Sequence, residues 1–397
     1  MDKKTVRDIE VKGKRVLVRV DFNVPLDTNS GTISDDSRIR AVLPTIKYLR
    51  DRGAKLILCS HLGKPKGKVV ENLRLAPVVK RLSELLELPV SSTRESIGPE
   101  VEDAVSRLSD GDLLMLENLR FYPEEEENNL EFAKALARLG DVYVNDAFGT
   151  AHRAHASTEG IAHYLPAVAG FLLEKELDSL GKILTDPQHP FAAIIGGAKV
   201  SDKIVFLENI QNKVDYLLIG GGMCCTFLKA QGYKINCPVV EEDKLDFARE
   251  LMNKAARNGA SLILPTDVIV AESFASGIPY RVVSVEEIPD NWYVMDIGPQ
   301  TLESFTAELK RCKTILWNGP MGVFEFNESR KGTESIARLL ADLDATTIVG
   351  GGSTAEAVTE FGLADKMTHV STGGGASLRF LEGKTLPGVA ALMDKAS

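Results

Sequence analysis

Short apolar runs alternate along this chain with longer segments whose apolar residues recur at helical spacing. In the first part of the chain, runs rich in valine, leucine and isoleucine predict strands at residues 15–20, 55–59, 113–116 and 142–144. The segments 77–86 and 130–139 each place their apolar residues on one stripe, as helices that pack on a sheet do. Strands that alternate with helices indicate parallel βαβ units, so the pattern predicts an α/β fold.

The later part of the chain repeats this pattern. Apolar runs predict further strands at 191–195, 216–219, 261–264, 314–317 and 346–349. Between the two halves, the segment 169–184 has a helical pattern that Pro187 and Pro190 would end. A chain of 397 residues also exceeds what one hydrophobic core usually organises. We therefore expect two Rossmann-like lobes, each a mainly parallel sheet flanked by helices, joined by a hinge helix.

The residues that follow the predicted strands differ between the two halves. Charged and amide side chains follow the early strands, whereas glycine clusters follow several later ones. In an open α/β sheet, ligands bind outside the carboxyl ends of the strands. We therefore expect each lobe to hold a different ligand.

The basic residues near the early strand ends predict a site for a small multianionic ligand. Four of them lie in segments that begin near such an end: Arg38, His61, Arg120 and Arg153. Guanidinium groups match phosphate and carboxylate oxygens bidentately. Asp21 and Asn23 occupy alternate positions and suit recognition of a hydroxyl group. A single arginine of this kind is more often a surface residue, and capping is the alternative for Asp21 and Asn23, so only the joint placement of these residues favours a binding site.

The glycine clusters predict loops that bind phosphate, because glycine lets backbone N–H groups approach an anion at the start of a helix. Lys199 and Lys203 lie beside the first cluster. A tight turn remains an alternative for any single cluster. The chain contains neither a Walker-type Gly-x-x-x-x-Gly-Lys-Ser/Thr element nor Gly-x-Gly-x-x-Gly, so the nucleotide site must be of another kind.

Composition excludes several classes of protein. The chain is 44% hydrophobic and 26% charged, and its apolar runs are shorter than the ~20 residues that span a bilayer. A net charge of -9 argues against nonspecific binding of nucleic acid. The polar N-terminal segment is unlike a signal peptide, so we expect a cytoplasmic protein without a membrane partner. We expect the five cysteines to be buried thiols and the acidic run 124–127 to be a solvated loop.

A series of motifs resembles those of the phosphoglycerate kinases, in family order and over essentially the whole chain. They lie at residues 19–25 (RVDFNVP), 60–63 (SHLG), 117–122 (ENLRFY), 145–148 (NDAF), 152–155 (HRAH), 196–200 (GGAKV), 220–223 (GGGM), 317–325 (WNGPMGVFE) and 371–376 (STGGGA). The resemblance implies reversible transfer of a phosphoryl group from 1,3-bisphosphoglycerate to ADP, giving 3-phosphoglycerate and ATP, in glycolysis and gluconeogenesis. It implies a monomeric phosphotransferase with a carboxyl group as acceptor, which uses Mg²⁺ with its nucleotide.

The resemblance also implies roles for individual residues. It assigns 3-phosphoglycerate or its acyl phosphate to Asp21, Phe22, Asn23, Arg38, His61, Leu62, Gly63, Lys64, Arg120 and Arg153. It assigns the nucleotide to Gly197, Ala198, Lys199, Lys203, Gly222, Glu325, Gly351, Gly352, Ser353 and Thr354, with Glu325 on the ribose hydroxyls. Direct transfer from an acyl phosphate needs no protein nucleophile. We expect Arg38 and Lys199, with backbone donors at Gly374 and Gly375, to stabilise the transition state.

The same resemblance implies a division of the chain. Residues 1–170, with a returning segment at about 377–397, would bind 3-phosphoglycerate; residues 171–186 would connect; and residues 187–376 would bind the nucleotide. Because the two ligands lie on separate lobes, we expect hinge closure to bring them together and to expel water.

Two positions depart from the family pattern. Lys64 stands where arginine is usual, which keeps the charge but loses the planar fork. Ser353 stands where aspartate, a residue thought to help hold Mg²⁺, is usual. Residues 353–356 match a capping box, so we expect Ser353 to cap a helix. Its hydroxyl stays a candidate for an Mg²⁺ that the nucleotide mainly holds.

Two other functions remain open. A lobed sensor of phosphorylated metabolites would keep both sites without turnover, and it would not need the transition-state charges of Arg38 and Lys199. A kinase of another small acid would be expected to alter Asp21, Asn23 and Arg120, which match the family pattern.

Overall fold

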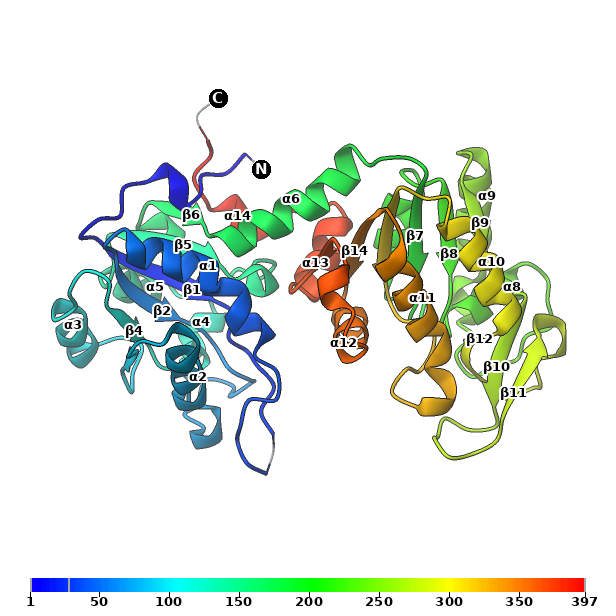
Figure 1. Cartoon of the computed structure of the whole chain (residues 1–397), viewed down its shortest axis with the longest axis horizontal. Coiled ribbons are helices and arrows are strands. Elements are labelled where there is room, and N and C mark those ends of the chain that lie inside the picture. The colour runs from blue at the N-terminus through cyan, green and yellow to red at the C-terminus, as the bar shows by residue number, and fades with distance from the viewer. Residues whose placement is uncertain (1, 28, 396–397) are drawn as a thin grey trace. The chain divides into compact units, whose positions relative to one another are not determined.

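The computed structural model of the chain describes residues 2–27 and 29–395 (Figure 1). It divides into two compact units. The first unit runs up to Asp178 and includes the residues from Thr385 on, and the second unit is Ser179–Lys384. Each unit is built around a six-stranded parallel sheet with helices on both faces, which confirms the predicted fold class.

The sheet of the first unit has the strand order β3-β4-β2-β1-β5-β6. Its strands are β1 (Arg15–Val20), β2 (Lys55–Cys59), β3 (Ser91–Ser92), β4 (Leu113–Met115), β5 (Val142–Asp146) and β6 (Ala167–Ala169). Register places Arg19 beside Cys59 on one side and Asn145 on the other. The carboxyl ends of β1, β2 and β5 therefore lie together at one edge of the sheet.

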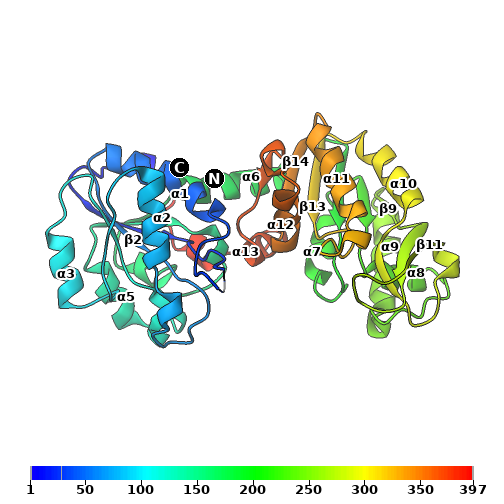
Figure 2. The ribbon, with the colours of Figure 1, turned by 60° about the horizontal axis from the view of Figure 1, so that its bottom comes forward.

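Helices cover both faces of this sheet (Figure 2). They are α1 (Ser37–Asp51), α2 (Ala76–Leu86), α3 (Pro99–Ser106), α4 (Pro123–Glu126), α5 (Leu130–Ala137) and α14 (Pro387–Ala390), with short 3-10 helices η3 (Leu119–Phe121) and η4 (Phe148–Thr150). Ile39, Val42, Ile46 and Leu49 recur every three or four residues along α1 and are fully buried. They pack with alternate residues of β1, such as Val18, and this spacing explains the helix.

The second unit has the strand order β15-β14-β13-β7-β8-β9. Its strands are β7 (Phe191–Ile195), β8 (Tyr216–Ile219), β9 (Ser261–Ile263), β13 (Thr314–Asn318), β14 (Thr346–Gly350) and β15 (His369–Val370). Its helices are α7 (Ile204–Ile210), α8 (Cys224–Ala230), α9 (Leu245–Arg257), α10 (Pro299–Leu309), α11 (Lys331–Asp342), α12 (Gly352–Glu360) and α13 (Gly375–Leu381). The four strands that glycines follow, β14, β13, β7 and β8, are neighbours in this sheet.

An antiparallel sheet in the second unit was not predicted. It consists of β10 (Asp267–Ala271), β11 (Tyr280–Ser284) and β12 (Tyr293–Ile297), with β10 in the centre. Most residues of β11 are exposed or half-buried, so that strand lacks an apolar run. The strands that were predicted are confirmed to within two residues at either end.

The predicted helix at 169–184 is α6 (Phe171–Thr185). It begins two residues later than predicted because Ala169 still belongs to β6 and the buried carboxylate of Asp146 accepts from the backbone N–H groups of Leu172 and Leu173. The division between the units falls within α6, at Asp178.

The prediction of a solvated loop at 124–127 is wrong. Residues 124–126 belong to α4 and Glu127 is its C-cap, and the side chain of Glu125 is completely buried, with hydrogen bonds from Ser157. The five cysteines are buried free thiols, as expected. Within the described part of the chain, no helix is both long enough and apolar enough to span a bilayer.

Candidate active site

The carboxyl edge of the first sheet collects basic side chains from several elements. His61 follows β2, Arg120 lies in η3 after β4, and Arg153 comes after β5 and η4. Arg38 is the second residue of α1. We call the following residues the basic cluster: Arg19, Arg38, His61, Arg120, Arg153 and His155.

Arg38 links the end of β1 to the loop that follows it. Its Nη1 donates to the carbonyl oxygen of Asn23 at 3.0 Å and lies 3.4 Å from both carboxylate oxygens of Asp21. The backbone N–H of Gly63 donates to Asn23 Oδ1 at 2.8 Å. A cation in the first turn of a helix opposes the helix dipole, so the stability of α1 does not account for Arg38.

Arg120 is nearly buried and incompletely bonded. Its Nη1 donates to the carbonyl oxygen of Gly63 at 3.3 Å, while its buried Nε makes no hydrogen bond to any described residue and lies 3.8 Å from Glu126 Oε1 in a long ion pair. Burial, together with the charges of Arg19 and Arg153, lowers its pKa from the usual value, although Glu126 acts in the opposite direction. A buried donor without an acceptor is well placed for an anionic ligand.

The two histidines of the cluster are held neutral. Burial holds the pKa of His61 well below its ordinary value, and Arg19, Arg120 and Arg38 lower it further. Burial and the nearby Arg120 lower the pKa of His155 to about 4. The positive charge of the cluster at neutral pH therefore comes from its arginines.

The remaining predicted substrate residues differ in their surroundings. The side chains of Phe22 and Leu62 are buried in the hydrophobic core, so only their backbone can face a ligand. Lys64 is exposed, and no hydrogen bond or ion pair joins it to the basic cluster in the described part of the chain. Arg19 was not predicted, although a charged residue inside an apolar strand was a signal of it.

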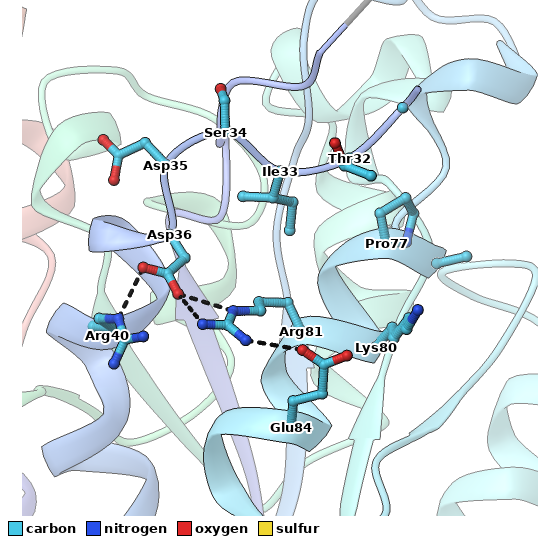
Figure 3. Close-up of a pocket in the computed structure, with 12 residues that line it drawn as sticks. Thr32, Ile33, Ser34, Asp35, Asp36, Arg40, Pro77, Lys80, Arg81 and Glu84 are labelled. Carbon is cyan, nitrogen blue, oxygen red and sulfur yellow. Dashed lines mark hydrogen bonds and ion pairs between the residues drawn. The ribbon is translucent and has the colours of Figure 1, made fainter. Parts of the chain in front are cut away.

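The first unit also has a surface pocket, which is lined by other residues (Figure 3). It has a volume of about 800 Å³ and lies between the loop at 31–36 and α2. Asp36 pairs there with Arg40 and with Arg81, at 2.8 and 2.7 Å, and Arg81 also pairs with Glu84. None of the predicted site residues lines this pocket, so we assign it no role in the reaction.

In the second unit, the glycine loops after adjacent strands pack directly on one another. Gly221 N–H donates to the carbonyl oxygen of Met321 at 3.0 Å, and Met223 N–H donates to that of Gly197 at 3.0 Å. Gly221 has a φ of +68°, and a Cβ there would lie 2.6 Å from the carbonyl oxygen of Gly197. Close packing of loops thus requires glycine at this position, besides any role in binding phosphate.

Lys203 lies beside these loops in an unusual environment. Its Nζ donates to Asn318 Oδ1, and burial lowers the pKa of Lys203 to about 8. The Nδ2 of Asn318 is buried without a hydrogen-bond partner in the described part of the chain. Asn318 was not predicted as a site residue, although it ends β13 inside the 317–325 motif.

The other predicted nucleotide residues lie at the same edge of the sheet. Ala198, Lys199 and Glu325 are exposed, and Gly222 is half-buried. Thr354 is buried, and its Oγ1 accepts from Gly319 N–H at 2.7 Å.

The prediction that Ser353 caps a helix is wrong. α12 begins at Gly352, its N-cap is Gly351 with a φ of +95°, and no side chain caps it. Ser353 therefore lies inside the first turn and is exposed. The capping-box pattern failed because glycine allowed the helix to start earlier. Gly374 is likewise the N-cap of α13, so Gly375 begins that helix.

No group of three or more His, Cys, Asp or Glu side chains that could hold a metal ion occurs among the described residues. The hydroxyl groups of Ser353 and Thr354 are the oxygen donors in the first turn of α12. They suit a hard cation but carry no charge, so a nucleotide would have to supply most of the ligands of an Mg²⁺ ion.

The chain matches known proteins over nearly its full length. A family model, phosphoglycerate kinase, matches residues 6–384. The chain is 58% identical over 395 residues to the phosphoglycerate kinase of Moorella thermoacetica and 56% identical over 395 residues to that of Pelotomaculum thermopropionicum, with 100% of both chains covered in each case. Among solved structures, it resembles phosphoglycerate kinase from Coxiella burnetii, with a TM-score of 0.88 and 42% identity, and that from Pyrococcus horikoshii, with 0.85 and 33%; each match covers 98% of both chains.

Proposed function

Because this chain belongs to the phosphoglycerate kinase family, we propose that its basic cluster binds 3-phosphoglycerate and that its glycine loops bind the nucleotide. The chain is a phosphotransferase with a carboxyl group as acceptor, and its glycolytic reaction converts 1,3-bisphosphoglycerate and ADP reversibly to 3-phosphoglycerate and ATP. The first unit would thus hold one substrate and the second unit the other.

The basic cluster carries this proposal on the substrate side. Three arginines lower the pKa of a neutral His61, and the buried Nε of Arg120 makes no hydrogen bond in the described part of the chain, its nearest ion-pair partner being Glu126 at 3.8 Å. The phosphate and carboxylate of 3-phosphoglycerate supply hydrogen-bond acceptors. Asp21 and Asn23, fixed by Arg38 and Gly63, would receive the hydroxyl group. Lys64 and Arg153, which are exposed, would contribute charge, while Phe22 and Leu62 would contribute backbone.

On the nucleotide side, the charged form of Lys203 and the backbone of Gly197, Gly222 and the 351–354 loop would receive the phosphates. Lys199 extends from the same edge, and Glu325 would accept from the ribose hydroxyls. Mg²⁺ would neutralise phosphate charge while held mainly by the nucleotide, and the hydroxyl of Ser353 in the first turn of α12 would be a candidate protein ligand.

The transfer itself needs positioning and charge, because the acyl phosphate is already activated. A terminal oxygen of ADP attacks the phosphorus in line, and the bond to the carboxylate oxygen breaks. Arg38 and Lys199 would offset the charge that spreads over the moving phosphoryl group, with backbone donors at Gly374 and Gly375. Since the ligands belong to separate units, hinge movement near the ends of α6 and after Ala376 would bring them together and exclude water. We expect a monomer in the cytoplasm without nucleic-acid or membrane partners.

A coupled assay of ATP-dependent phosphorylation of 3-phosphoglycerate, with and without Mg²⁺, tests this function. Lys199→Ala should lower kcat by about 100-fold or more, as expected for a lost transition-state charge. Lys310→Ala, which removes an exposed lysine just after α10 at the opposite edge of the sheet, is the matched control. Binding of both ligands by the wild type without turnover would instead favour the sensor.

A further inference from the structure

Two ionisable side chains that interact with one another, one of them a member of the basic cluster, are completely buried. Arg19 lies within β1 and Glu125 within α4, and neither is accessible to solvent. A buried charge is costly unless it is paired and its hydrogen-bonding atoms have partners. The partners of these two groups therefore indicate what they do.

A chain of hydrogen bonds joins the two groups through Ser157. Arg19 Nε donates to Ser157 Oγ at 2.8 Å, and Ser157 Oγ donates to Glu125 Oε1 at 2.5 Å. The backbone N–H of Ser157 donates to Glu125 Oε2 at 3.1 Å. Because a guanidinium has donors only, Ser157 Oγ accepts from Arg19, and its single hydroxyl proton is directed to Glu125.

The other end of Arg19 reaches His61. Its Nη2 lies 3.1 Å from His61 Nδ1, while its Nη1 donates to the carbonyl oxygen of Val20. Since Arg19 can only donate, Nδ1 must accept, and the single proton of the neutral imidazole lies on Nε2.

We propose that Glu125, through Ser157 and Arg19, is a positioning residue that holds His61 in the tautomer with the proton on Nε2. This inference rests on the proposed binding of 3-phosphoglycerate at the basic cluster. An Nε2–H group can donate to an anionic oxygen, whereas the other tautomer would present a lone pair to it. Without the acceptor at Ser157, only the carbonyl oxygen of Val20 would hold Arg19, and His61 would exchange between the two tautomers.

A purely structural role for Glu125 is the alternative. Its carboxylate accepts from the backbone N–H of Ser157 at 3.1 Å, so the Glu125 side chain also ties α4 to the segment after β5. Loss of that tie would lower the stability of the protein. It would change neither the protonation of His61 nor the KM for 3-phosphoglycerate relative to the KM for ATP. The test therefore needs a readout on the imidazole ring itself.

Nitrogen NMR of the ligand-free protein with labelled histidine provides this readout. The chain has six histidines, and the His61 signals are those that His61→Gln removes. In the wild type, Nδ1 should show the shift of an unprotonated ring nitrogen and Nε2 that of a protonated one. A proton on Nδ1 of His61 in the wild type would overturn the inference.

Ser157→Ala breaks the chain at its centre and should move both ring nitrogens toward averaged shifts. It should also raise the KM for 3-phosphoglycerate by about three- to tenfold, the range of one lost hydrogen bond, while the KM for ATP stays unchanged. Ser96→Ala is the matched control, because Ser96 is equally buried in the first unit and its Oγ donates to the carbonyl oxygen of Glu117 at 2.7 Å. It should alter neither readout.

Glu125→Gln keeps the size of the side chain and removes its charge, so it should act in the same direction as Ser157→Ala. Wild-type His61 signals and KM values in both variants would refute the positioning role. If both variants fail to fold, the wild-type nitrogen shifts alone decide. A wild type that does not phosphorylate 3-phosphoglycerate would count against the proposed function, while its His61 spectrum would still report on the tautomer.

Discussion

The depressed pKa of Lys203 makes nucleotide binding sensitive to pH. Burial lowers this pKa from the ordinary 10.5 to about 8, although Asp202 and Glu382 act in the opposite direction. In the unliganded protein, the amine is therefore mostly charged at about pH 7 and mostly neutral at about pH 9. The proposed phosphate contact requires the charged form.

The size of the effect follows from this difference. A pKa of about 8 in place of 10.5 corresponds to roughly 3 kcal/mol in favour of the neutral amine. A bound phosphate would oppose this preference and raise the pKa of Lys203 in the complex. Above about pH 8, binding of ADP should then take up one proton, and its Kd should rise by up to about tenfold per pH unit.

Isothermal titration calorimetry of ADP binding in buffers of different ionisation enthalpy counts these protons. We expect uptake of close to one proton at about pH 9 and much less at about pH 7. Lys203→Met should abolish the uptake and weaken binding at about pH 7, whereas Lys310→Met is the matched control. An ADP affinity that stays flat over this range, without proton uptake, would refute a contact between Lys203 and the phosphates.

The stability of the second unit provides an independent check. Because the folded pKa lies below the unfolded one, the unfavourable contribution of Lys203 is complete below about pH 8 and fades as the pH rises toward 10.5. The free energy of unfolding of Lys203→Met, relative to the wild type, should therefore fall by up to about 3 kcal/mol over that range. Trp292 and Trp317 both lie in the second unit, so tryptophan fluorescence during urea unfolding measures the free energy of unfolding of that unit. A difference independent of pH would contradict the burial argument.

Three other substitutions test separate parts of the molecule. Gly221→Ala should destabilise the second unit by roughly 2–4 kcal/mol, because its Cβ would press on the carbonyl oxygen of Gly197; a wild-type urea midpoint would exclude this close packing. Burial raises the pKa of Asp146 from 3.8 to about 7, so its unfavourable contribution to the free energy of folding develops as the pH rises between these values. In calorimetry, Asp146→Asn should therefore become more stable relative to the wild type from about pH 4 to about pH 7. A stability difference that does not change with pH would argue against the raised pKa of Asp146. Ser353→Asp should raise the ratio of ADP affinities with and without Mg²⁺ several-fold, with Ser353→Asn as the control; equal ratios would mean that the metal does not approach this residue.

Local patterns in the sequence were sufficient to predict those strands and helices whose structure depends on one segment alone. The main parallel strands were predicted because their apolar runs are continuous, and α2 was predicted because its buried Val78, Leu82 and Leu86 recur at helical spacing. β11 was missed because it is largely exposed, and the two-residue strands β3 and β15 are too short to carry a period. The capping box at 353–356 misled because two glycines before it allowed α12 to begin earlier.

The sequence by itself determined the α/β class, the contrast between a basic and a glycine-rich set of strand ends, and the family. Each of these can be recognised from short stretches of consecutive residues. Only the tertiary structure decided that Glu125 is buried, that Arg19 donates to Nδ1 of His61, and that burial lowers the pKa of Lys203 to about 8. Arg19 and Ser157 are 138 residues apart, and Lys203 and Asn318 are 115 apart. Burial and hydrogen bonding set the protonation of these groups, and both arise only when distant segments of the chain pack together.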